Sequence, residues 1–398
     1  MSKRLLILGA GQNQIALYEI AKRHGIETVA MDGNPNAPGF AVADVSEAGD
    51  LQDAAVVADA ATWHKVDGIY PAAEWGVEAG FTAAHQLGLP GLTPEAAVCA
   101  RNKLAMREAL EAAGIPNPAF RGVDSLDEAE QAANDIGLPV IVKPVDGNAS
   151  RGVRRLDYIE DMPLAHALAE KESSSGTVLI EGFCEGDEFN IDGLMYEGRF
   201  IPGGITGKER PASHTRFDLG IFMPPGLGVA KEAEICDLTE RACRAIGLHS
   251  GTVHLEIITT ESGPRVIEIA ARPGGGRIPT DLIPMTYGMD IMADAFRIAL
   301  GEAPRESRQF EKATAVYWFP ARPGIVTEIV GEAEARAIAN VVELHVFVKP
   351  GDEVKHIVDC VTRDRIGYVY ARGENVDEAV AATRQALEMC KVVTRPTV

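Results

Sequence analysis

Two short apolar segments, each carrying one glutamate, constrain this chain more than any other feature of its sequence. Glu256 lies in residues 251–258 (GTVHLEII), and Glu268 lies in residues 265–270 (RVIEIA). The residues between them, 259–264 (TTESGP), are typical of a hairpin turn. An antiparallel hairpin would bring the two glutamates side by side on neighbouring strands. Their even separation allows both to face the same side if no bulge intervenes.

Two carboxylates that are held together on a buried sheet repel each other unless a cation lies between them. Oxygen ligands of this kind suit Mg²⁺, which also needs phosphate oxygens to complete its octahedron. The pair therefore predicts a magnesium site beside a bound phosphate compound. The alternative is a hairpin whose acids simply face water.

The composition indicates a folded, globular chain of two to four domains. The chain has 398 residues, of which 46% are hydrophobic and 24% charged. A net charge of −20 argues against a nucleic-acid or anionic-membrane surface, so neither partner is expected. The six cysteines form no C-x-x-C pair, and the chain shows no signal peptide and no long apolar run. We therefore expect a cytoplasmic protein with reduced thiols.

The first ninety or so residues alternate between strands and helices. The expected strands are 5–8, 27–31 and 67–70, and the expected helices are 15–23 and 74–87. This rhythm predicts a parallel, Rossmann-like sheet with helices on both faces. Gly9-x-Gly11, followed by Asp32, is a weak match to a dinucleotide fingerprint, and Gln14 stands where the third glycine would be. An NAD site is therefore not expected.

The remainder of the chain predicts a mixture of α/β and α+β structure. The expected helices are 94–113, with Thr93 as N-cap, 125–136, 230–246, 290–300 and 376–388. The expected strands are 138–143, 178–180, 188–195 and 200–205, and a long loop is expected at 207–228. From Lys312 onwards the pattern indicates a β-rich unit that the last helix closes.

A second candidate site lies at the end of the strand 138–143. Lys143 ends this strand, and a loop of small polar residues follows at 144–153 (PVDGNASRGV). Flexible backbone N–H groups in such a loop can fold over phosphates, and the lysine supplies a positive charge to the same phosphates. The spacing is not that of a Walker loop, and alone the segment would more often be a solvated loop.

A third signal follows the strand 178–180. Glu181 and a kinked segment, Gly182-x-x-x-Gly186, resemble a hinge between domains that offers backbone groups to an adenine edge. The alternative is a simple exit from strand to turn.

Together these motifs resemble the ATP-grasp superfamily over nearly the whole chain. The matching motifs are the Asn102-Lys103 helix, residues 142–144 with the loop 150–153, residues 180–183, Glu188, and the glutamate pair followed by residues 271–275 (ARPGG). The resemblance implies three domains. They are a Rossmann-like domain at 1–95, an ATP-grasp domain at 96–305 with a mobile lid at about 115–180, and a small β-rich C-terminal cap at 306–398.

The resemblance also implies a role for each matching residue. The ATP site would comprise Lys103, Lys143, Ser150, Arg151, Gly152, Glu181, Phe183, Glu188 and Ile258. In this site the two lysines would hold phosphates. Glu181 would accept from the adenine amino group, and Glu188 would hold the ribose hydroxyls. Glu256 and Glu268 would bind Mg²⁺ or Mn²⁺, while Lys143 and Arg272 would be catalytic.

Within the superfamily, residues 268–276 (EIAARPGGG) and the tail from Lys312 are similar to biotin-carboxylase-like ligases of the L-amino acid (dipeptide) ligase kind. This implies an ATP-dependent carboxylate–amine ligase that forms an amide through an acyl phosphate from amino acids or other small carboxylates. Its substrates would meet Lys208, His214, Arg272, Gly275 and Gly276. Many members carry Asn where this chain has Ala270, so metal binding would rest on two glutamates, phosphates and water. Homodimers are usual in this branch.

Several alternatives stay open on the sequence. The amine must be neutral to react, and a base is expected among Lys208, Glu209 and His214 without a choice between them. A purine-biosynthesis-type or bicarbonate-activating ligase is the alternative enzyme, although the bicarbonate-site motif Gln-Val-Glu-His is absent after Arg272. A degenerate ATP sensor is the alternative outside enzymes, and the complete set of expected ATP residues argues against it.

Overall fold

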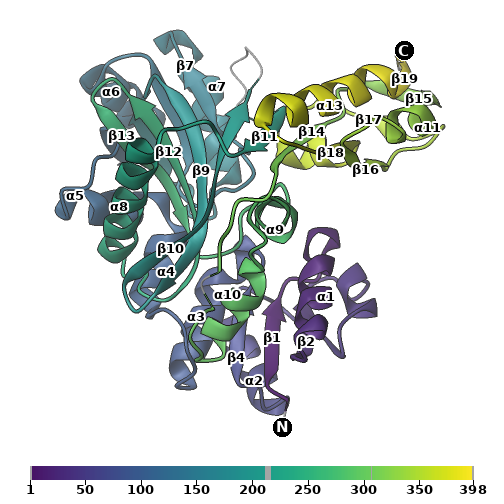
Figure 1. Cartoon of the computed structure of the whole chain (residues 1–398). Coiled ribbons are helices and arrows are strands. Elements are labelled where there is room, and N and C mark those ends of the chain that lie inside the picture. Colours follow the sequence, from purple (N-terminus) through teal and green to yellow (C-terminus); the bar gives the residue numbers. More distant parts are fainter. Residues whose placement is uncertain (1, 211–216, 306, 397–398) are drawn as a thin grey trace. The chain divides into compact units, whose positions relative to one another are not determined.

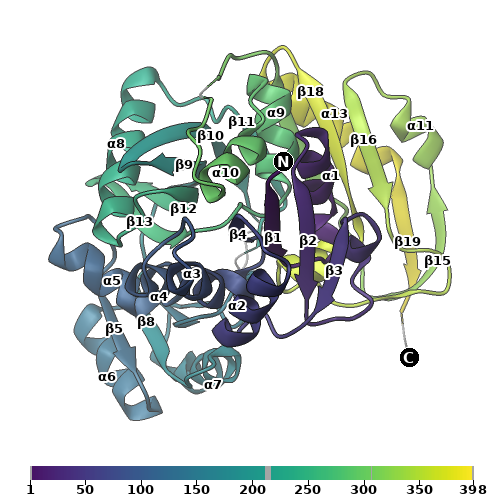
Figure 2. The same cartoon turned by 90° about the horizontal axis from the view of Figure 1, so that it is seen from below.

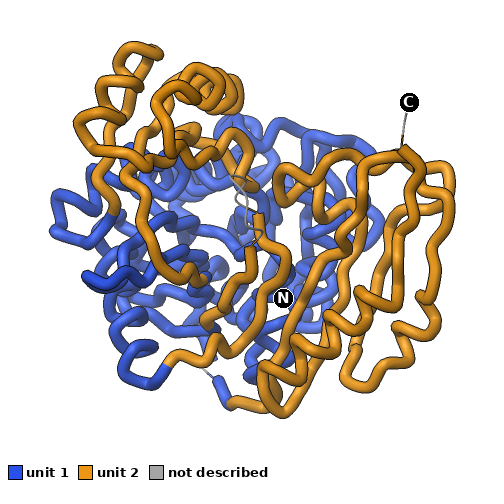
Figure 3. Tube along the Cα trace, turned by 90° about the horizontal axis from the view of Figure 1, so that it is seen from above, with its two compact units in different colours: residues 1–117, 190–204, 228–309 blue, residues 118–189, 205–227, 310–398 orange. Residues whose placement is uncertain are grey.

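The computed structural model describes residues 2–210, 217–305 and 307–396. The chain falls into two compact units, which Figure 3 distinguishes by colour. Unit 1 comprises residues 1–117, 190–204 and 228–309, and unit 2 comprises residues 118–189, 205–227 and 310–398. Strands β9 (Asp187–Tyr196) and β10 (Arg199–Glu209) contribute residues to both units. The division into domains at 1–95, 96–305 and 306–398 stays a prediction.

Unit 1 begins with a parallel four-stranded sheet, which confirms the expected Rossmann-like fold (Figure 2). Its strand order is β3-β2-β1-β4, and every neighbouring pair is parallel. The strands are β1 (Arg4–Leu8), β2 (Glu27–Asp32), β3 (Val45–Ala48) and β4 (Gly68–Pro71). The accompanying helices are α1 (Ile15–Arg23), α2 (Ala54–Trp63) and α3 (Val77–Gln86).

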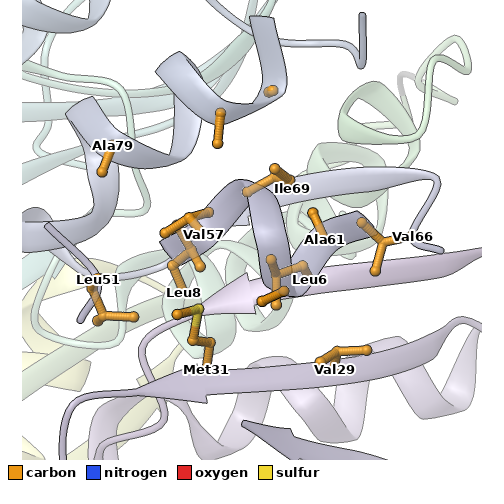
Figure 4. Packing of buried hydrophobic residues seen from close by; sticks show 13 residues of the cluster. Leu6, Leu8, Val29, Met31, Leu51, Val57, Ala61, Val66, Ile69 and Ala79 are labelled. Atoms are coloured by element: carbon orange, nitrogen blue, oxygen red, sulfur yellow. The ribbon is translucent and has the colours of Figure 1, made fainter. Parts of the chain in front are cut away.

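The core of this sheet is formed by side chains from the strands and from α2 and α3. Leu6 and Leu8 of β1 are fully buried and belong to one cluster with Val57 of α2 (Figure 4). Continuous apolar strands of this kind are what a parallel sheet covered on both faces requires. Asp32 accepts a hydrogen bond from Ala10 N–H at 2.8 Å, so its carboxylate helps to hold the turn after β1.

The helix predicted at 94–113 is instead two helices, α4 (Pro94–Arg101) and α5 (Lys103–Ala112). Thr93 caps α4 as predicted. Asn102 has an extended backbone, and its side chain accepts from the N–H groups of Leu104 and Ala105. Asn102 therefore ends one helix and caps the next. The break places Lys103 in the first turn of α5.

The remaining part of unit 1 surrounds an antiparallel hairpin, β12 (Gly251–Thr260) and β13 (Gly263–Ala270). The order here is β13-β12-β9-β10, and β13 packs against the long helix α8 (Val229–Ala245) (Figure 1). A π-helical turn (Ile278–Leu282) leads into α9 (Ile283–Tyr287) and α10 (Ile291–Ala299). Among the helices that the structure describes, none has the length and apolar character needed to cross a membrane.

Unit 2 contains an antiparallel sheet with the order β5-β8-β6-β7. Its elements are β5 (Phe120–Val123), α6 (Leu126–Ile136), β6 (Val140–Pro144), β7 (Arg154–Leu156), α7 (Met162–Glu172) and β8 (Val178–Gly182). Helices α6 and α7 share one apolar core with this sheet. The predicted helix at 125–136 is confirmed, with Ser125 as its N-cap.

The predicted loop at 207–228 is wrong in part, because β10 continues to Glu209 and a further strand, β11 (Gly220–Met223), pairs with it. The order in this part of unit 2 is β10-β11-β14-β18-β16. Its remaining strands are β14 (Ala313–Trp318), β16 (Val341–Val346) and β18 (Gly367–Gly373). Helix α13 (Val376–Met389), expected at 376–388, packs on β14 and β18 (Figure 1).

A small antiparallel sheet of the order β17-β15-β19 completes unit 2. It comprises β15 (Gly324–Val330), β17 (Glu353–Val354) and β19 (Lys391–Arg395), with the short helices α11 (Glu332–Arg336) and α12 (Cys360–Asp364) in the connections. The expected β-rich tail is therefore present.

Candidate active site

The two glutamates of the hairpin lie directly opposite each other. The register pairs Glu256 with Glu268. Next to the turn, Thr260 pairs with Gly263. From that turn, a regular ladder would pair Glu256 with Ile267 and would turn Glu268 to the other face. A bulge at Ile267 shifts the register by one residue. The expectation that the pair needs an unbulged hairpin is therefore wrong, because the bulge is what brings the carboxylates together.

Lys103 contacts this pair from the start of α5. Its Nζ lies 3.2 Å from Glu268 Oε1, and the side chain is buried rather than on the surface, where such a lysine would ordinarily lie. Among the residues that the structure describes, no group of three or more His, Cys, Asp and Glu side chains is placed to hold a metal ion. Two carboxylates nevertheless suit Mg²⁺, because this ion keeps waters and takes phosphate oxygens as its other ligands.

Arg272 lies four residues after Glu268 and forms a partly buried ion pair with Glu74, just after β4. Arg272 Nε donates to the Glu74 carboxylate, and Arg101 Nε lies 4.0 Å from the same carboxylate. Burial alone would raise the pKa of Glu74, but Arg272, Lys103 and Arg101 together hold that pKa below its ordinary value of 4.5. Glu74 was missed in the sequence because its partner is 198 residues away.

A buried histidine and aspartate lie beside this group. His254 Nδ1 is 3.0 Å from Asp192 Oδ1, and the carboxylate holds the pKa of His254 above its ordinary value although burial alone would lower it. A Cβ on Gly274 would lie 2.3 Å from Asp192 Oδ1 and 2.6 Å from His254 Nδ1, so only glycine fits there. His254 precedes Glu256 by two residues on β12 and therefore shares its face. That spacing was the signal available in the sequence.

The other residues predicted in unit 1 lie on β12 or in the segment after β13. Ile258 follows Glu256 by two residues on β12 and is buried. A Cβ on Gly275 would meet no atom within 4 Å, and Gly276 has a left-handed backbone (φ 63°). The segment after Arg272 therefore has free space beside Gly275, and its backbone makes a left-handed turn at Gly276.

Unit 2 holds the second group of predicted residues. Lys143 Nζ on β6 lies 2.7 Å from Glu181 Oε2 on β8, and both side chains are buried. Glu188 on β9 binds Lys208 Nζ at 2.8 Å and also accepts from Arg210. These carboxylates and cations therefore neutralise one another within the unit.

Two of the three candidate bases, Lys208 and Glu209, do not lie in a loop as predicted. Lys208 and Glu209 are both on β10, with Lys208 paired to Glu188. The Glu209 carboxylate accepts from Tyr317 Oη at 2.6 Å and from Arg384 Nη2 at 2.6 Å. His214 lies outside the described residues.

The predicted phosphate loop has an unusual backbone. Ala149 and Ser150 both have positive φ values, 55° and 61°, and Gly152 follows with 69°. Left-handed conformations at successive non-glycine residues are uncommon and are found mostly where function requires a tight turn. Arg151 is held inside the loop by Asn148 Oδ1 at 2.5 Å. Phe183, one of the residues expected in the ATP site, lies with its ring 4.1 Å from the Arg155 guanidinium.

The structure thus brings the predicted residues together in two groups. Unit 1 holds Lys103, Glu256, Ile258, Glu268, Arg272, Gly275 and Gly276, and unit 2 holds Lys143, Ser150, Arg151, Gly152, Glu181, Phe183, Glu188 and Lys208.

Comparison with known families agrees with this geometry. Residues 136–281 match the ATP-grasp domain, and residues 316–395 match the L-amino acid ligase C-terminal domain 2. The chain therefore contains an ATP-grasp domain. Its C-terminal part is the one that L-amino acid ligases carry, so the resemblance seen in the sequence is confirmed.

Two individual proteins are similar to this chain over much of its length. An uncharacterized protein of Sinorhizobium fredii is 33% identical over 305 residues, which cover 75% of this chain and 62% of that protein. An L-arginine-specific L-amino acid ligase of Bacillus subtilis is 27% identical over 278 residues, which cover 67% of this chain and 66% of that enzyme. The chain thus matches less than two thirds of the length of each of these relatives.

Solved structures confirm the fold over the whole chain. The crystal structure of an L-amino acid ligase from Bacillus licheniformis superimposes with a TM-score of 0.85 and 22% identity, covering 99% of both chains. Purine-biosynthesis ligases are also among the structures with this fold.

Proposed function

We propose that this chain is an ATP-dependent carboxylate–amine ligase that joins two small substrates, with amino acids as the best candidates. The observation that carries the proposal is the arrangement in unit 1. A pair of opposed glutamates suited to Mg²⁺ lies beside Lys103, and the Arg272–Glu74 ion pair follows four residues later along the chain.

The reaction has two steps. A carboxylate oxygen of one substrate attacks the γ-phosphorus of ATP, so that the acyl phosphate forms and ADP leaves. The neutral amine of the second substrate then attacks the acyl carbon, and the amide forms as phosphate leaves. Negative charge gathers on phosphoryl and carboxyl oxygens in both steps, so fixed cations stabilise both transition states.

Glu256 and Glu268 are proposed to hold Mg²⁺ or Mn²⁺, which would supply charge neutralisation to the ATP phosphates. Lys103 already lies on Glu268 and is proposed to turn to the phosphates when they bind. In unit 2, Lys143 and the loop at 150–152 are proposed to bind phosphates, and Glu181, Phe183 and Glu188 to bind the nucleoside.

The Arg272–Glu74 pair supports an amino acid as substrate. An amino acid carries a carboxylate and an ammonium group, and the pair offers a guanidinium for the first and a carboxylate for the second. Glu74 is buried and Arg272 is partly buried, and each neutralises the other, so a zwitterion can take the place of their mutual contact without leaving a charge unpaired. Gly275 has open space where a side chain would lie, which leaves room for the same small ligand to approach the backbone.

The test is product mass after incubation of the protein with ATP, Mg²⁺ and mixed amino acids. An amide product with ADP release is expected. Arg272→Lys keeps the charge but loses the planar fork, so turnover should fall sharply while ATP binding persists. Arg297→Lys, on α10, removes a guanidinium that binds the Ala303 carbonyl and serves as the control with unchanged turnover.

The rival reading is a purine-type or bicarbonate-activating ligase. If no amino acid pair yields an amide, while bicarbonate or a phosphoribosylamine drives ADP release, the amino acid proposal is wrong and this alternative replaces it.

A further inference from the structure

The outer edge of β13 is covered by a set of specific contacts from the chain around α5. In the sheet order β13 is the terminal strand, so one row of its backbone groups faces no partner strand within the described part of the chain. Val266 N–H donates to the Pro116 carbonyl at 2.9 Å. Ile269 N–H lies 3.2 Å from Met106 Sδ. These contacts bracket the bulge at Ile267.

Arg107 binds the bulge itself. Its Nη1 donates to the Val266 carbonyl at 3.2 Å, and its Nη2 donates to the Ile267 carbonyl at 2.6 Å. In a regular strand successive carbonyls point to opposite sides, so one guanidinium cannot reach both. Here both carbonyls face Arg107 because the extra residue turns the backbone. The two Nη donors of the guanidinium can therefore reach both carbonyls of the bulged strand, but could not reach two successive carbonyls of a regular strand.

The burial of Arg107 shows that this contact is built into the unit. The residue has 0% of its surface exposed. A buried guanidinium is costly unless its donors are satisfied, and a lysine cannot supply two parallel donors. Arg107 also lies one helical turn after Lys103, so both project from the same face of α5. Two residues on one face of α5 thus hold Glu268 in place. Arg107 binds the backbone just before it, and Lys103 contacts its carboxylate.

We propose that Arg107 is a positioning residue, which holds the β-bulge at Ile267 and so turns Glu268 toward Glu256. Without the bulge, the two-residue turn would direct Glu268 to the opposite face of the hairpin. The inference rests on the proposed function in one respect, namely that these two glutamates hold the metal ion.

The first experiment compares Arg107→Met and Arg107→Lys with the unchanged protein. The apparent activation constant for Mg²⁺ should rise about 10- to 100-fold in Arg107→Met, as for other residues that orient metal ligands, and less in Arg107→Lys. The KM for the amino acid substrates, measured at saturating Mg²⁺, should change little. Mn²⁺ binding in the presence of ADP, followed by electron paramagnetic resonance, should weaken by the same factor without any turnover.

Arg265→Lys is the matched control. Arg265 lies on the same strand but on the turn side of the bulge, and its Nη1 also donates to a backbone carbonyl, that of Asn117, at 3.1 Å. Its substitution should leave both metal constants unchanged.

Removal of Ile267 tests the bulge directly. A strand one residue shorter would pair with β12 without a bulge, and Glu268 would still lie opposite Glu256. In that background Arg107→Lys should no longer weaken Mn²⁺ binding, and this comparison remains available if Arg107→Met fails to fold.

Two results would overturn the inference, and they differ. If the Arg107 variants lose thermal stability but keep normal metal constants, while Glu268→Gln weakens Mn²⁺ binding, Arg107 is only a structural residue. If Glu268→Gln also leaves Mn²⁺ binding unchanged, the proposed metal site is itself wrong.

Discussion

Lys143 Nζ and Glu181 Oε2 lie 2.7 Å apart on neighbouring strands of one sheet, and both side chains are almost completely buried. The first was expected to bind phosphate and the second to bind the adenine amino group. Each instead neutralises the other in the protein alone. A ligand that binds Lys143 or Glu181 therefore has to supply a contact that replaces the ion pair, because a buried charge without such a contact is costly.

A double-variant comparison separates the stability of this pair from its role in binding. Glu181→Gln should destabilise the fold by about 3 kcal/mol, because it removes the carboxylate that lies 2.7 Å from the buried Lys143 ammonium. Lys143→Met combined with Glu181→Leu should recover most of that stability, yet ATP should bind at least about tenfold more weakly, since a charge-assisted contact is lost. Urea unfolding and ATP titration measure the two effects. Normal ATP affinity in the double variant would show that the pair is purely structural.

The metal proposal predicts a large effect of a small change. Glu268→Gln preserves the volume and should keep the fold, but turnover should fall by about 10²-fold or more if the ion neutralises the transferring phosphoryl group. Glu261→Gln, in the exposed turn of the same hairpin, is the control and should behave like the unchanged protein. A near-normal kcat of Glu268→Gln at saturating Mg²⁺ would contradict the assignment.

The Glu74 carboxylate gives a prediction about acid stability. Its pKa in the folded protein lies below the ordinary value of 4.5, since the surrounding cations outweigh burial. The carboxylate therefore binds protons more weakly in the folded than in the unfolded state. Its contribution to stability is present above pH 4.5 and is lost as the pH falls through the lowered pKa.

Glu74→Gln should accordingly lower the unfolding free energy at neutral pH and flatten its decline below pH 4.5. Urea unfolding at a series of pH values between 7 and 3 measures the difference from the unchanged protein. Glu78→Gln, on the exposed face of α3, is the control. Parallel pH profiles for Glu74→Gln and the unchanged protein would refute the role given to Arg272 as the partner of Glu74.

The features that could be predicted from the sequence are those set by local patterns. The strand–helix alternation of the first 95 residues gave the parallel sheet, and Thr93 marked the start of α4 through its capping side chain. The order of the ATP-grasp motifs identified the fold class. These signals lie within short stretches of chain, so they can be recognised without knowledge of the tertiary structure.

The features that were missed depend on partners far away in the sequence. Strand β11 was assigned to a loop because its four residues are surrounded by glycine and proline, and only pairing with β10 and β14 defines it. Glu74 has no local signal, since its partner Arg272 is 198 residues away. The bulge at Ile267 leaves no mark in a pattern of alternating residues, although Arg107 makes it specific.

The loop at 146–152 gives the last prediction. Its residues are small and polar, and its tip takes up a left-handed backbone at Ala149 and Ser150 that costs free energy in the absence of a ligand. The loop is held by polar contacts, among them Arg151 with Asn148 and with Glu172, where the nitrogen–oxygen distance is 3.6 Å. Partly exposed contacts of this kind open more readily than an apolar core.

We therefore expect trypsin to cleave after Arg151 in the protein alone, and a non-hydrolysable ATP analogue with Mg²⁺ to slow that cleavage, because phosphates bound by the loop backbone would hold it closed. Cleavage after Lys65, an exposed residue of unit 1 that precedes β4, should proceed at the same rate in both states and serves as the internal control. Mass spectrometry of the fragments distinguishes the two sites. Equal cleavage after Arg151 with and without the analogue would mean that this loop does not close over phosphates.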